Sequence, residues 1–481
     1  MRITEDILKL FGPEQLYYNP QTLDHYSKDY SLFPSKRPDC VVKARNAEEI
    51  QHVLKYAGSN GIPVVPSSSR VHFYGGTIPQ KGGIVLDLTE MDRVLEIDEL
   101  NRRVRIEVGL TWGKLSKRLE EKGLRVMMPL YPHPLRSVVT DLLEREVITN
   151  TVYEYGESLQ GMEVVWPNGE VFRTGSASVE GYPESICKGV NPSGPGLDFY
   201  RLLQGAQGTM GVVTWANVKV EYLPKMDKIF FIPVSNISRG IEFLSQIMRL
   251  RVGQECFFLN RMNIALIFDV DFKKRGERVP PWTLLIVLSG FQRYPEEKIR
   301  YEEDLLRNLV KGEFQELLLL EELPNCPFSN LEIVRMLRRA WPDPLTYWKQ
   351  RYKKGCQSLF FVTKPSYVEK FVGIVEALAI QSGYKKGDIG MYIQPIEQNR
   401  ACHLEFNFYY DPENGPEKEG MAQLYQKAVL RCLNEGAHFT RPYGEASRVI
   451  YERAPEYVRT LKRVKAIFDP QNLMNPGRLC F

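Results

Sequence analysis

The sequence predicts a protein of the mixed α+β class, in which α/β units at the N-terminal end are followed by a domain with an antiparallel sheet. Three observations support this prediction. At 481 residues the chain is too long for one ordinary core, so two or three domains are expected. Strand and helix patterns alternate between Cys40 and Leu88 and again between Arg103 and Lys122. Beyond Lys225, aromatic-rich strands are separated by amphipathic helices.

The first α/β unit has recognisable start and stop signals. Cys40–Ala44 is a short apolar strand. Asn46 is placed to cap the next helix, with Glu49 three residues later as in a capping box. Val64–Val65 opens a second strand, and Gly83–Leu88 repeats the strand signal. We therefore expect strand, helix and strand in succession.

The middle of the chain is predicted to form a separate domain. Its expected strands are Ile229–Val234, Leu284–Gly290, Leu359–Thr363 and Glu405–Tyr410, and its clearest helices are Ile241–Leu250 and Glu296–Val310. Such units suggest an antiparallel sheet with helices on one face. The predicted boundaries are 1–224 for the first domain, 225–435 for the second, and 436–481 for a C-terminal segment that returns to the first.

Composition excludes several classes of function. The net charge of +4 is small and the basic residues are dispersed, so no nucleic-acid surface is expected. No apolar run reaches the roughly 18 residues of a membrane helix, and the N-terminus lacks the apolar core of a signal peptide. The eight cysteines have no CxxC spacing, which argues against a metal site and favours a reducing compartment, by default the cytoplasm.

Two segments have the composition of ligand-binding turns. Val64–Pro79 ends a strand in a turn rich in Ser and Gly, whose backbone N–H groups and hydroxyls suit a pyrophosphate. Leu202–Thr214 carries Gly205, Gly208 and Gly211, a spacing that permits close approach to a planar ligand. In isolation a surface turn is the better interpretation of the first segment, and a plain bend is as good an interpretation of the second. The GxGxxG and Walker patterns are both absent.

Two further segments complete the pattern. Tyr153–Gly175 predicts a β-hairpin around the turn Pro167–Gly169. Phe468–Gly477 is rich in turn residues that would fasten the C-terminus back onto a domain.

In this order, and separated by a cap-sized stretch, the four segments resemble the flavoprotein family of vanillyl-alcohol oxidase and 4-cresol dehydrogenase (p-cresol methylhydroxylase). The family's Gly-Arg-Asn-x-Gly-Tyr-Gly-Gly loop corresponds to Ser69–Gly76, its Ala-Leu-Glu-Arg-Gly-Val to Leu142–Val147, and its Pro-Tyr-Gly-Asp to Glu154–Glu157. The resemblance covers nearly the whole chain and is weakest in the middle domain. It implies a split FAD-binding domain of two α/β subdomains enclosing a substrate cap.

The resemblance also implies which residues bind FAD. They are Pro66, Ser67, Ser68, Ser69, Arg70, Val71, His72, Tyr74, Gly75, Gly76, Thr140, Leu143, Glu144, Gly156, Gly208, Gly211, Val212, His403 and Asn475. Some family members tether FAD covalently through the cap, and His403 matches that region. A hydrogen-bonded strand histidine is the alternative, and His72 is a second candidate tether.

Catalytic roles follow from the same resemblance. In the phenol-oxidising branch, a Tyr and an Arg hold the substrate phenolate, and Tyr74 and Arg441 match them, with Thr440 where the family has another Tyr. A bound phenolate favours hydride loss from the para benzylic carbon to the flavin, which leaves a quinone methide. Glu157 matches an acid near the flavin that handles a proton or water. The alternative for Arg441 is an ion pair with an acid such as Glu445.

Several positions depart from the family pattern. Ser69 and Phe73 replace Gly, Val71 replaces Asn, and Glu146 and Ile148 replace further Gly. The loop then follows another path, with the hydroxyls of Ser67–Ser69 and Arg70 around the pyrophosphate, or the chain is a non-catalytic partner subunit.

A competing enzyme class is the related 2-hydroxyacid dehydrogenases of the glycolate and D-lactate type. These place a His-Gly pair where this chain has Tyr443-Gly444, which counts against them. The expected partners are a small aromatic substrate and a homodimer, or a hetero-oligomer with an electron-accepting or homologous subunit.

Overall fold

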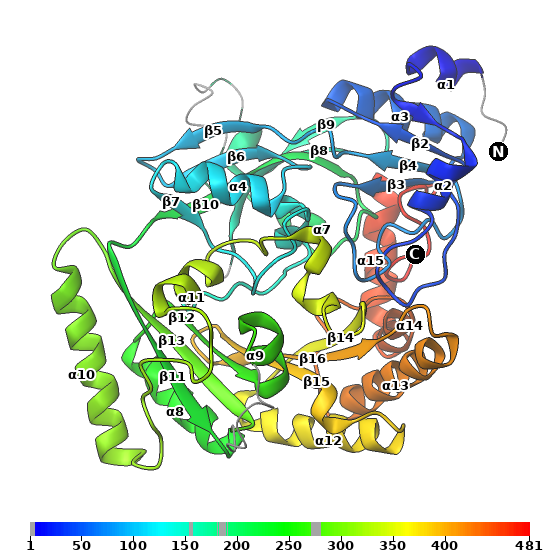
Figure 1. Cartoon of the computed structure of the whole chain (residues 1–481). Coiled ribbons are helices and arrows are strands. Elements are labelled where there is room, and N and C mark those ends of the chain that lie inside the picture. Colours follow the sequence, from blue (N-terminus) through cyan, green and yellow to red (C-terminus); the bar gives the residue numbers. More distant parts are fainter. Residues whose placement is uncertain (1–4, 153–156, 180, 182–188, 190, 271–279) are drawn as a thin grey trace.

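The computed structural model describes residues 5–152, 157–179, 181, 189, 191–270 and 280–481. Two sheets form the upper part of the molecule in Figure 1, and a third forms the lower part. Helices α14 (Glu445–Glu452) and α15 (Pro455–Phe468) lead from the lower part back to the upper one. Within the described ranges, no helix has the length and apolar character that crossing a membrane requires.

The first subdomain is the predicted α/β unit. Its sheet has the order β1 (Leu16–Tyr17), β2 (Cys40–Lys43), β4 (Ile84–Asp87) and β3 (Val64–Ser67), with β2, β4 and β3 parallel. Helices α1 (Glu5–Leu10), α2 (Pro20–Tyr26) and α3 (Ala47–Asn60) accompany it. Asn46 caps α3 by accepting a hydrogen bond from the Glu49 amide at 2.9 Å. The Glu49 carboxylate accepts from the Arg45 amide, one residue before the position that a capping box uses.

The second subdomain has an antiparallel sheet. Its strands are β5 (Val94–Asp98), β6 (Arg103–Glu107), β10 (Val212–Tyr222), β8 (Leu159–Val165) and β9 (Val171–Arg173), with β7 (Leu124–Val126) paired to β10. The helices are α4 (Trp112–Glu120), α5 (Val138–Leu143) and α7 (Tyr200–Leu203). The predicted hairpin is confirmed as β8 and β9. Hairpin connections such as β5–β6 impose antiparallel pairing, so only the first subdomain is α/β in the strict sense.

The third sheet is the predicted antiparallel cap. Its order is β11 (Met226–Val234), β13 (Trp282–Gly290), β12 (Glu255–Asn260), β15 (Ile389–Ile396), β16 (Ala401–Tyr410) and β14 (Gly355–Thr363). Helices α8 (Ile237–Leu250), α10 (Pro295–Glu313), α12 (Val368–Gln381) and α13 (Gly415–Asn434) lie on its outer side in Figure 1, and α9 (Arg261–Phe268) and α11 (Asn330–Leu337) on the other.

Alternation along the cap strands gives the sheet two different faces, because successive side chains point to opposite sides. In β11, Phe230 and Ile232 pack in the core shared with the outer helices. Phe231 belongs instead to a core that also contains Val71 and Phe73 from the first subdomain. The inner face of the cap therefore packs directly onto the predicted pyrophosphate loop.

The C-terminal turn is fastened to the first subdomain, as its composition predicts. The amide of Val64 donates to the Leu473 carbonyl at 2.8 Å, and the amide of Asn475 donates to the Val64 carbonyl at 2.8 Å. On α15, the Lys465 ammonium donates to Asp469 at 2.6 Å and also contacts the Thr209 carbonyl. These contacts hold the glycine bend, β3 and the C-terminus together.

Candidate active site

A cavity lies between the two N-terminal subdomains, and we call it the inter-subdomain cavity. Its outline encloses about 900 Å³ of space, part of which is open solvent. Three segments build its walls: the turn after β3, helix α5 with the residues that follow it, and the glycine bend before β10. Of the residues predicted to bind the cofactor, its lining includes Pro66, Ser68, His72, Tyr74, Gly76, Thr140, Leu143, Glu144, Gly208, Gly211 and Val212. These predicted residues, which are far apart in the sequence, therefore meet around one cavity.

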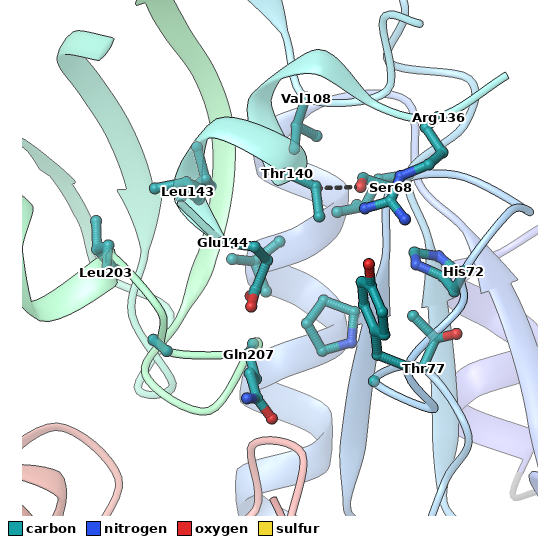
Figure 2. Close-up of a pocket in the computed structure, with 18 of the residues that line it drawn as sticks. Ser68, His72, Thr77, Val108, Arg136, Thr140, Leu143, Glu144, Leu203 and Gln207 are labelled. Carbon is teal, nitrogen blue, oxygen red and sulfur yellow. Dashed lines mark hydrogen bonds between the residues drawn. The ribbon is translucent and has the colours of Figure 1, made fainter. Parts of the chain in front are cut away.

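Helix α5 presents polar groups to the cavity. Ser137 caps the helix by accepting a hydrogen bond from the Thr140 amide at 3.1 Å. The hydroxyls of Thr140 and Ser68 are 2.5 Å apart, which joins the helix to the turn after β3 (Figure 2). Beyond the helix, Glu144 points toward Gln207 (Figure 2). Burial raises the pKa of Glu144, although a hydrogen bond from the Tyr443 hydroxyl at 2.7 Å opposes the shift.

Gly208 and Gly211 pack closely against neighbouring strands of the protein. Gly208 has φ +71°, and a Cβ there would lie 2.7 Å from the Cγ of Pro66. A Cβ on Gly211 would lie 2.9 Å from a methyl carbon of Val164. These glycines thus let the bend pack tightly on β3 and β8. By contrast, a Cβ on Gly76 would have no neighbour within 4 Å.

The serine-and-arginine part of the turn does not have the predicted arrangement. Among the described residues of the cavity lining, Ser67, Ser69, Arg70, Val71 and Gly75 are absent. The Arg70 guanidinium donates to the His25 carbonyl at 3.0 Å and lies 3.6 Å from the Tyr26 ring centroid. The expectation that this arginine faces the pyrophosphate is therefore wrong, because stacking on α2 turns it away from the cavity.

The other four residues are held within the protein. The hydroxyl of Ser67 donates to the Ser69 carbonyl at 3.0 Å, and the hydroxyl of Ser69 donates to the Val71 carbonyl at 3.3 Å. The Val71 side chain is buried in the core shared with the cap. The amide of Gly75 donates to Asp29 at 2.8 Å. Local bonds and packing thus satisfy groups that the sequence suggested for a ligand.

Asn475 supports the cavity from behind. Its side-chain amide donates to the carbonyls of Gly76, at 2.9 Å, and Gln207, at 2.7 Å. These two residues line the cavity, whereas Asn475 is outside the described lining. Asn475 therefore holds Gly76 and Gln207 in position in the cavity wall. Gly156, another predicted cofactor residue, lies outside the described part of the chain.

A second cavity adjoins the first and lies under the cap, and we call it the cap cavity. Its outline encloses about 610 Å³ of space, part of which is open solvent. Phe73, Tyr74 and Arg136 line both. The cap side contributes several aromatic rings, which are Tyr347, Trp348 and Tyr392. The Tyr74 ring stacks on Tyr443 with centroids 4.7 Å apart, and burial strongly raises the pKa of its hydroxyl. An aromatic compartment is therefore next to the inter-subdomain cavity.

Buried charges surround this compartment in pairs. The pairs are Arg136 with Asp141, Lys349 with Glu405, and Arg441 with Glu146. The Lys349 ammonium is 2.6 Å from Glu405. Burial alone would raise the pKa of Glu405, but the charges and hydrogen bonds of Lys349 and His403 together outweigh burial and hold the pKa far below its usual range. Pairing therefore keeps Glu405 ionised in a buried site.

Arg441 does not line the cap cavity among the described residues, although it was expected to contact the substrate directly. Its guanidinium donates to Glu146, which lines the cap cavity, while Arg441 is not among the described lining residues. The guanidinium also lies 4.2 Å from the Phe360 ring centroid. The acid partner suggested by the sequence was Glu445, whereas the partner found is Glu146, which replaces a family glycine. The carboxylate stands between the arginine and the cavity.

His403 and Glu157 lie away from their expected positions. His403 is in the cap cavity, 3.4 Å from Glu405, and not in the described lining of the inter-subdomain cavity, which instead contains His72. Burial lowers the pKa of His72 to about 3. Glu157 pairs with Arg201 at the surface and lines neither cavity as the described residues define them. A surface cation thus holds the acid that was expected near the flavin.

Sequence reasoning missed several residues of the site, namely Arg136, Asp141, Glu146 as a lining residue, Gln207, Lys349, Glu405 and Tyr443. One signal was available in β16. His403 and Glu405 alternate with Leu404 and Phe406, which predicts a strand with one apolar and one polar face. Both faces are buried, and the polar one is the wall of the cap cavity.

Comparison with known families decides the identity of this architecture. Residues 38–175 match the family described as FAD binding domain. Residues 223–479 match the family described as FAD linked oxidases, C-terminal domain, which is more than half of the chain. The chain belongs to the FAD-linked oxidases. It is accordingly an FAD-dependent oxidoreductase.

Two groups of proteins are similar to this FAD-linked oxidase. Among sequences, the glycolate oxidase subunit GlcD of Bacillus subtilis (strain 168) is 25% identical, covering 99% of this chain and 96% of its own. The D-lactate dehydrogenase of Anaerostipes hadrus is 23% identical, covering 100% and 98%.

Among solved structures, p-cresol methylhydroxylase with substrate bound has a TM-score of 0.85 at 20% identity, covering 99% and 96% of the two chains. The 4-ethylphenol oxidase of Gulosibacter chungangensis has a TM-score of 0.84 at 18% identity, covering 98% and 95%. These matches establish the fold.

The residues of the inter-subdomain cavity fit FAD. Of the bulky residues at the substituted positions, Phe73 lines the cavity and stacks on Tyr30 with ring centroids 5.5 Å apart, while Leu142 packs in the core. Hydroxyls from Ser68, Thr77 and Thr140 border it and can donate to phosphate or ribose oxygens.

Proposed function

We propose that this FAD-linked oxidase oxidises a neutral, para-substituted phenol at its benzylic carbon, with FAD in the inter-subdomain cavity and the substrate in the cap cavity. The observation that carries the proposal is an aromatic compartment that shares Phe73 and Tyr74 with the inter-subdomain cavity. FAD, when bound, supplies the hydride acceptor. The protein's part is to bind the ring, exclude water and handle the hydroxyl proton.

The lining supports an aromatic substrate. Tyr74, Tyr347, Trp348 and Tyr392 offer ring faces and edges, which favour offset or edge-to-face contact with a bound ring. The hydroxyl of Tyr74 is a donor that its high pKa keeps protonated at neutral pH. It can therefore donate a hydrogen bond to the oxygen of a phenol.

The charges support a substrate without a carboxylate. The buried cations around the cap cavity each contact an acid within the protein, as the three pairs above show. A substrate carboxylate would add a further negative charge to a compartment whose cations are already neutralised, and burying an uncompensated charge is costly. A neutral hydroxyl compound avoids that cost.

A second candidate is oxidation of a 2-hydroxyacid, which the names of the sequence relatives favour. One observation supports it. Within the described part of the chain, the Arg441 Nη2 is buried and has no hydrogen-bond partner. If Glu146 moved aside, this group could bind a carboxylate in a bidentate manner. Against it stands Tyr443, at the position where that class is expected to carry His.

Anaerobic mixing of the purified protein with each substrate class distinguishes the two activities. We expect 4-methylphenol or vanillyl alcohol to bleach the flavin band at about 450 nm within one turnover, and D-lactate, glycolate and D-2-hydroxyglutarate to leave it unchanged. If a hydroxyacid bleaches the flavin and no phenol does, the proposed phenol oxidation is wrong and the protein oxidises 2-hydroxyacids instead. Acid precipitation of the same sample tests the tether, since free FAD stays in the supernatant.

A further inference from the structure

Glu146 occupies a position in the cap cavity where a substrate hydroxyl can reach it. Its carboxylate lines the cavity, and the recorded contact of that carboxylate among the described residues joins Oε2 to Arg441. No hydrogen bond or ion pair to Oε1 is found among the described residues, so this oxygen can accept one from a ligand. By comparison, both oxygens of Glu405 have contacts, with Lys349 at 2.6 Å and His403 at 3.4 Å. Unlike Glu405, Glu146 therefore has a carboxylate oxygen free to accept a hydrogen bond.

The surroundings of Glu146 favour its ionised form. Burial alone would raise the pKa of Glu146, but the charge of Arg441, followed by those of Arg136 and Lys349, outweighs burial and lowers it. The acids that face it are Glu405 and Asp141. The phenol groups that face it are Tyr74, Tyr347 and Tyr392, whose pKa values are raised by burial. At neutral pH the group available to accept a proton is therefore a carboxylate held in place by a guanidinium.

We propose that Glu146 accepts the hydroxyl proton of the substrate as hydride leaves its benzylic carbon, an inference that rests on the proposed phenol oxidation. In this step the benzylic C–H bond breaks and its electron pair passes to FAD, which is reduced. The phenolic O–H bond breaks, and its proton forms a bond to the Glu146 carboxylate. A neutral quinone methide remains, so atoms, charge and electrons balance.

The chemistry requires such an acceptor when the phenol binds as a neutral molecule. Hydride loss from a neutral phenol leaves a cation whose hydroxyl is a very strong acid, so a base in contact lowers the barrier. Two differences from the family pattern bear on this step. Thr440 stands where a second phenolate-holding Tyr was expected, and Glu146 stands where Gly was expected. The site has fewer donors for a phenolate and gains an acceptor for a phenol.

The test is Glu146→Gln, followed by rapid anaerobic mixing with 4-methylphenol from pH 6 to pH 10. We expect normal FAD content and flavin reduction slower at pH 7 by about 10²–10⁴-fold, the usual contribution of a general base. The rate of the variant should rise with pH toward the pKa of the free phenol, about 10 as for Tyr, because phenolate needs no base. The wild-type rate should vary little over that range.

Matched measurements separate this role from a structural one. Glu303→Gln is the control, because Glu303 is also a carboxylate paired with cations, namely Lys228 and Arg307, but lines neither cavity as the described residues define them. The rate and pH profile of flavin reduction in this variant should match those of wild type. If Glu146→Gln does not retain FAD, two other measurements take its place. They are the rate and pH profile of flavin reduction in Glu146→Asp, and the effect of D₂O on the rate of flavin reduction in wild type. An FAD-replete Glu146→Gln with the wild-type pH profile, or a wild-type rate unaffected by D₂O, would overturn the inference. Failure of every phenol to reduce wild type would instead sink the proposed function.

Discussion

Gly208→Val should yield a protein that binds FAD about a hundredfold more weakly and purifies nearly colourless. The residue has φ +71°, where a side chain costs roughly 1–2 kcal/mol, and a Cβ would lie 2.7 Å from the Cγ of Pro66. Overpacking of this kind adds roughly 1–3 kcal/mol. Because Pro66 and Gly208 both line the inter-subdomain cavity, relief of the clash must move its wall. The ratio of flavin absorbance to protein absorbance measures the loss.

The matched control is Gly383→Val. This glycine has φ +76°, but a Cβ there has no neighbour within 4 Å, so the substitution introduces the same backbone strain without the clash. It should keep a wild-type flavin content. Adding FAD to each apoprotein should raise the melting temperature of wild type and Gly383→Val clearly, and that of Gly208→Val by a much smaller amount at the same FAD concentration. If Gly208→Val binds FAD as wild type does, FAD does not occupy this cavity.

Glu255→Gln should lower the free energy of unfolding by about 3–5 kcal/mol, the usual effect of removing one partner of a buried ion pair. Glu255 on β12 contacts Arg125 of β7 at 2.6 Å and Arg338, just after α11, at 2.9 Å. The side chains of all three are almost fully buried. Because Arg125 belongs to the second N-terminal subdomain and Glu255 to the cap, the substitution leaves uncompensated charge where they meet. Urea midpoints from tryptophan fluorescence measure the change.

Glu121→Gln is the corresponding surface control. Glu121 pairs with Arg118 at 3.3 Å, and both side chains are more than half exposed. Exposed pairs contribute little because water screens them, so the urea midpoint should stay close to that of wild type. Equal effects of the two substitutions would contradict the assignment of the Glu255 cluster as a main connection between the cap and the rest of the protein.

The same cluster predicts a pH dependence of stability. Burial alone would raise the pKa of Glu255, but Arg338 and Arg125 outweigh it and lower the pKa to about 2 from the usual 4.5. A depressed folded-state pKa stabilises the protein above pH 4.5, and that stabilisation is lost as the pH falls toward 2. The amount is roughly 3 kcal/mol, so wild type should lose stability more steeply than Glu255→Gln between pH 5 and pH 3. Parallel curves would exclude this cause.

Local signals were sufficient for much of the fold. The caps and glycines around α3, the hairpin of β8 and β9, and the alternating patterns of the cap strands depend on interactions within a few residues, so the sequence displays them directly. The antiparallel second sheet was not apparent from the sequence, because β10 pairs with strands up to about a hundred residues away. The hydrophobic pattern of a strand does not indicate which other strands it pairs with.

By itself the sequence determined the order and spacing of the segments, and their resemblance to a flavoprotein family assigned the turn after Pro66, Thr140 and the bend at Gly208 to one ligand. The structure places all three around one cavity. Only the tertiary structure decided which way the charged side chains face. Arg70 turns to the ring of Tyr26, and Arg441 meets Glu146, 295 residues away along the chain. The physical reason is that a buried charge must find its partner in three dimensions, and sequence spacing holds no record of that choice.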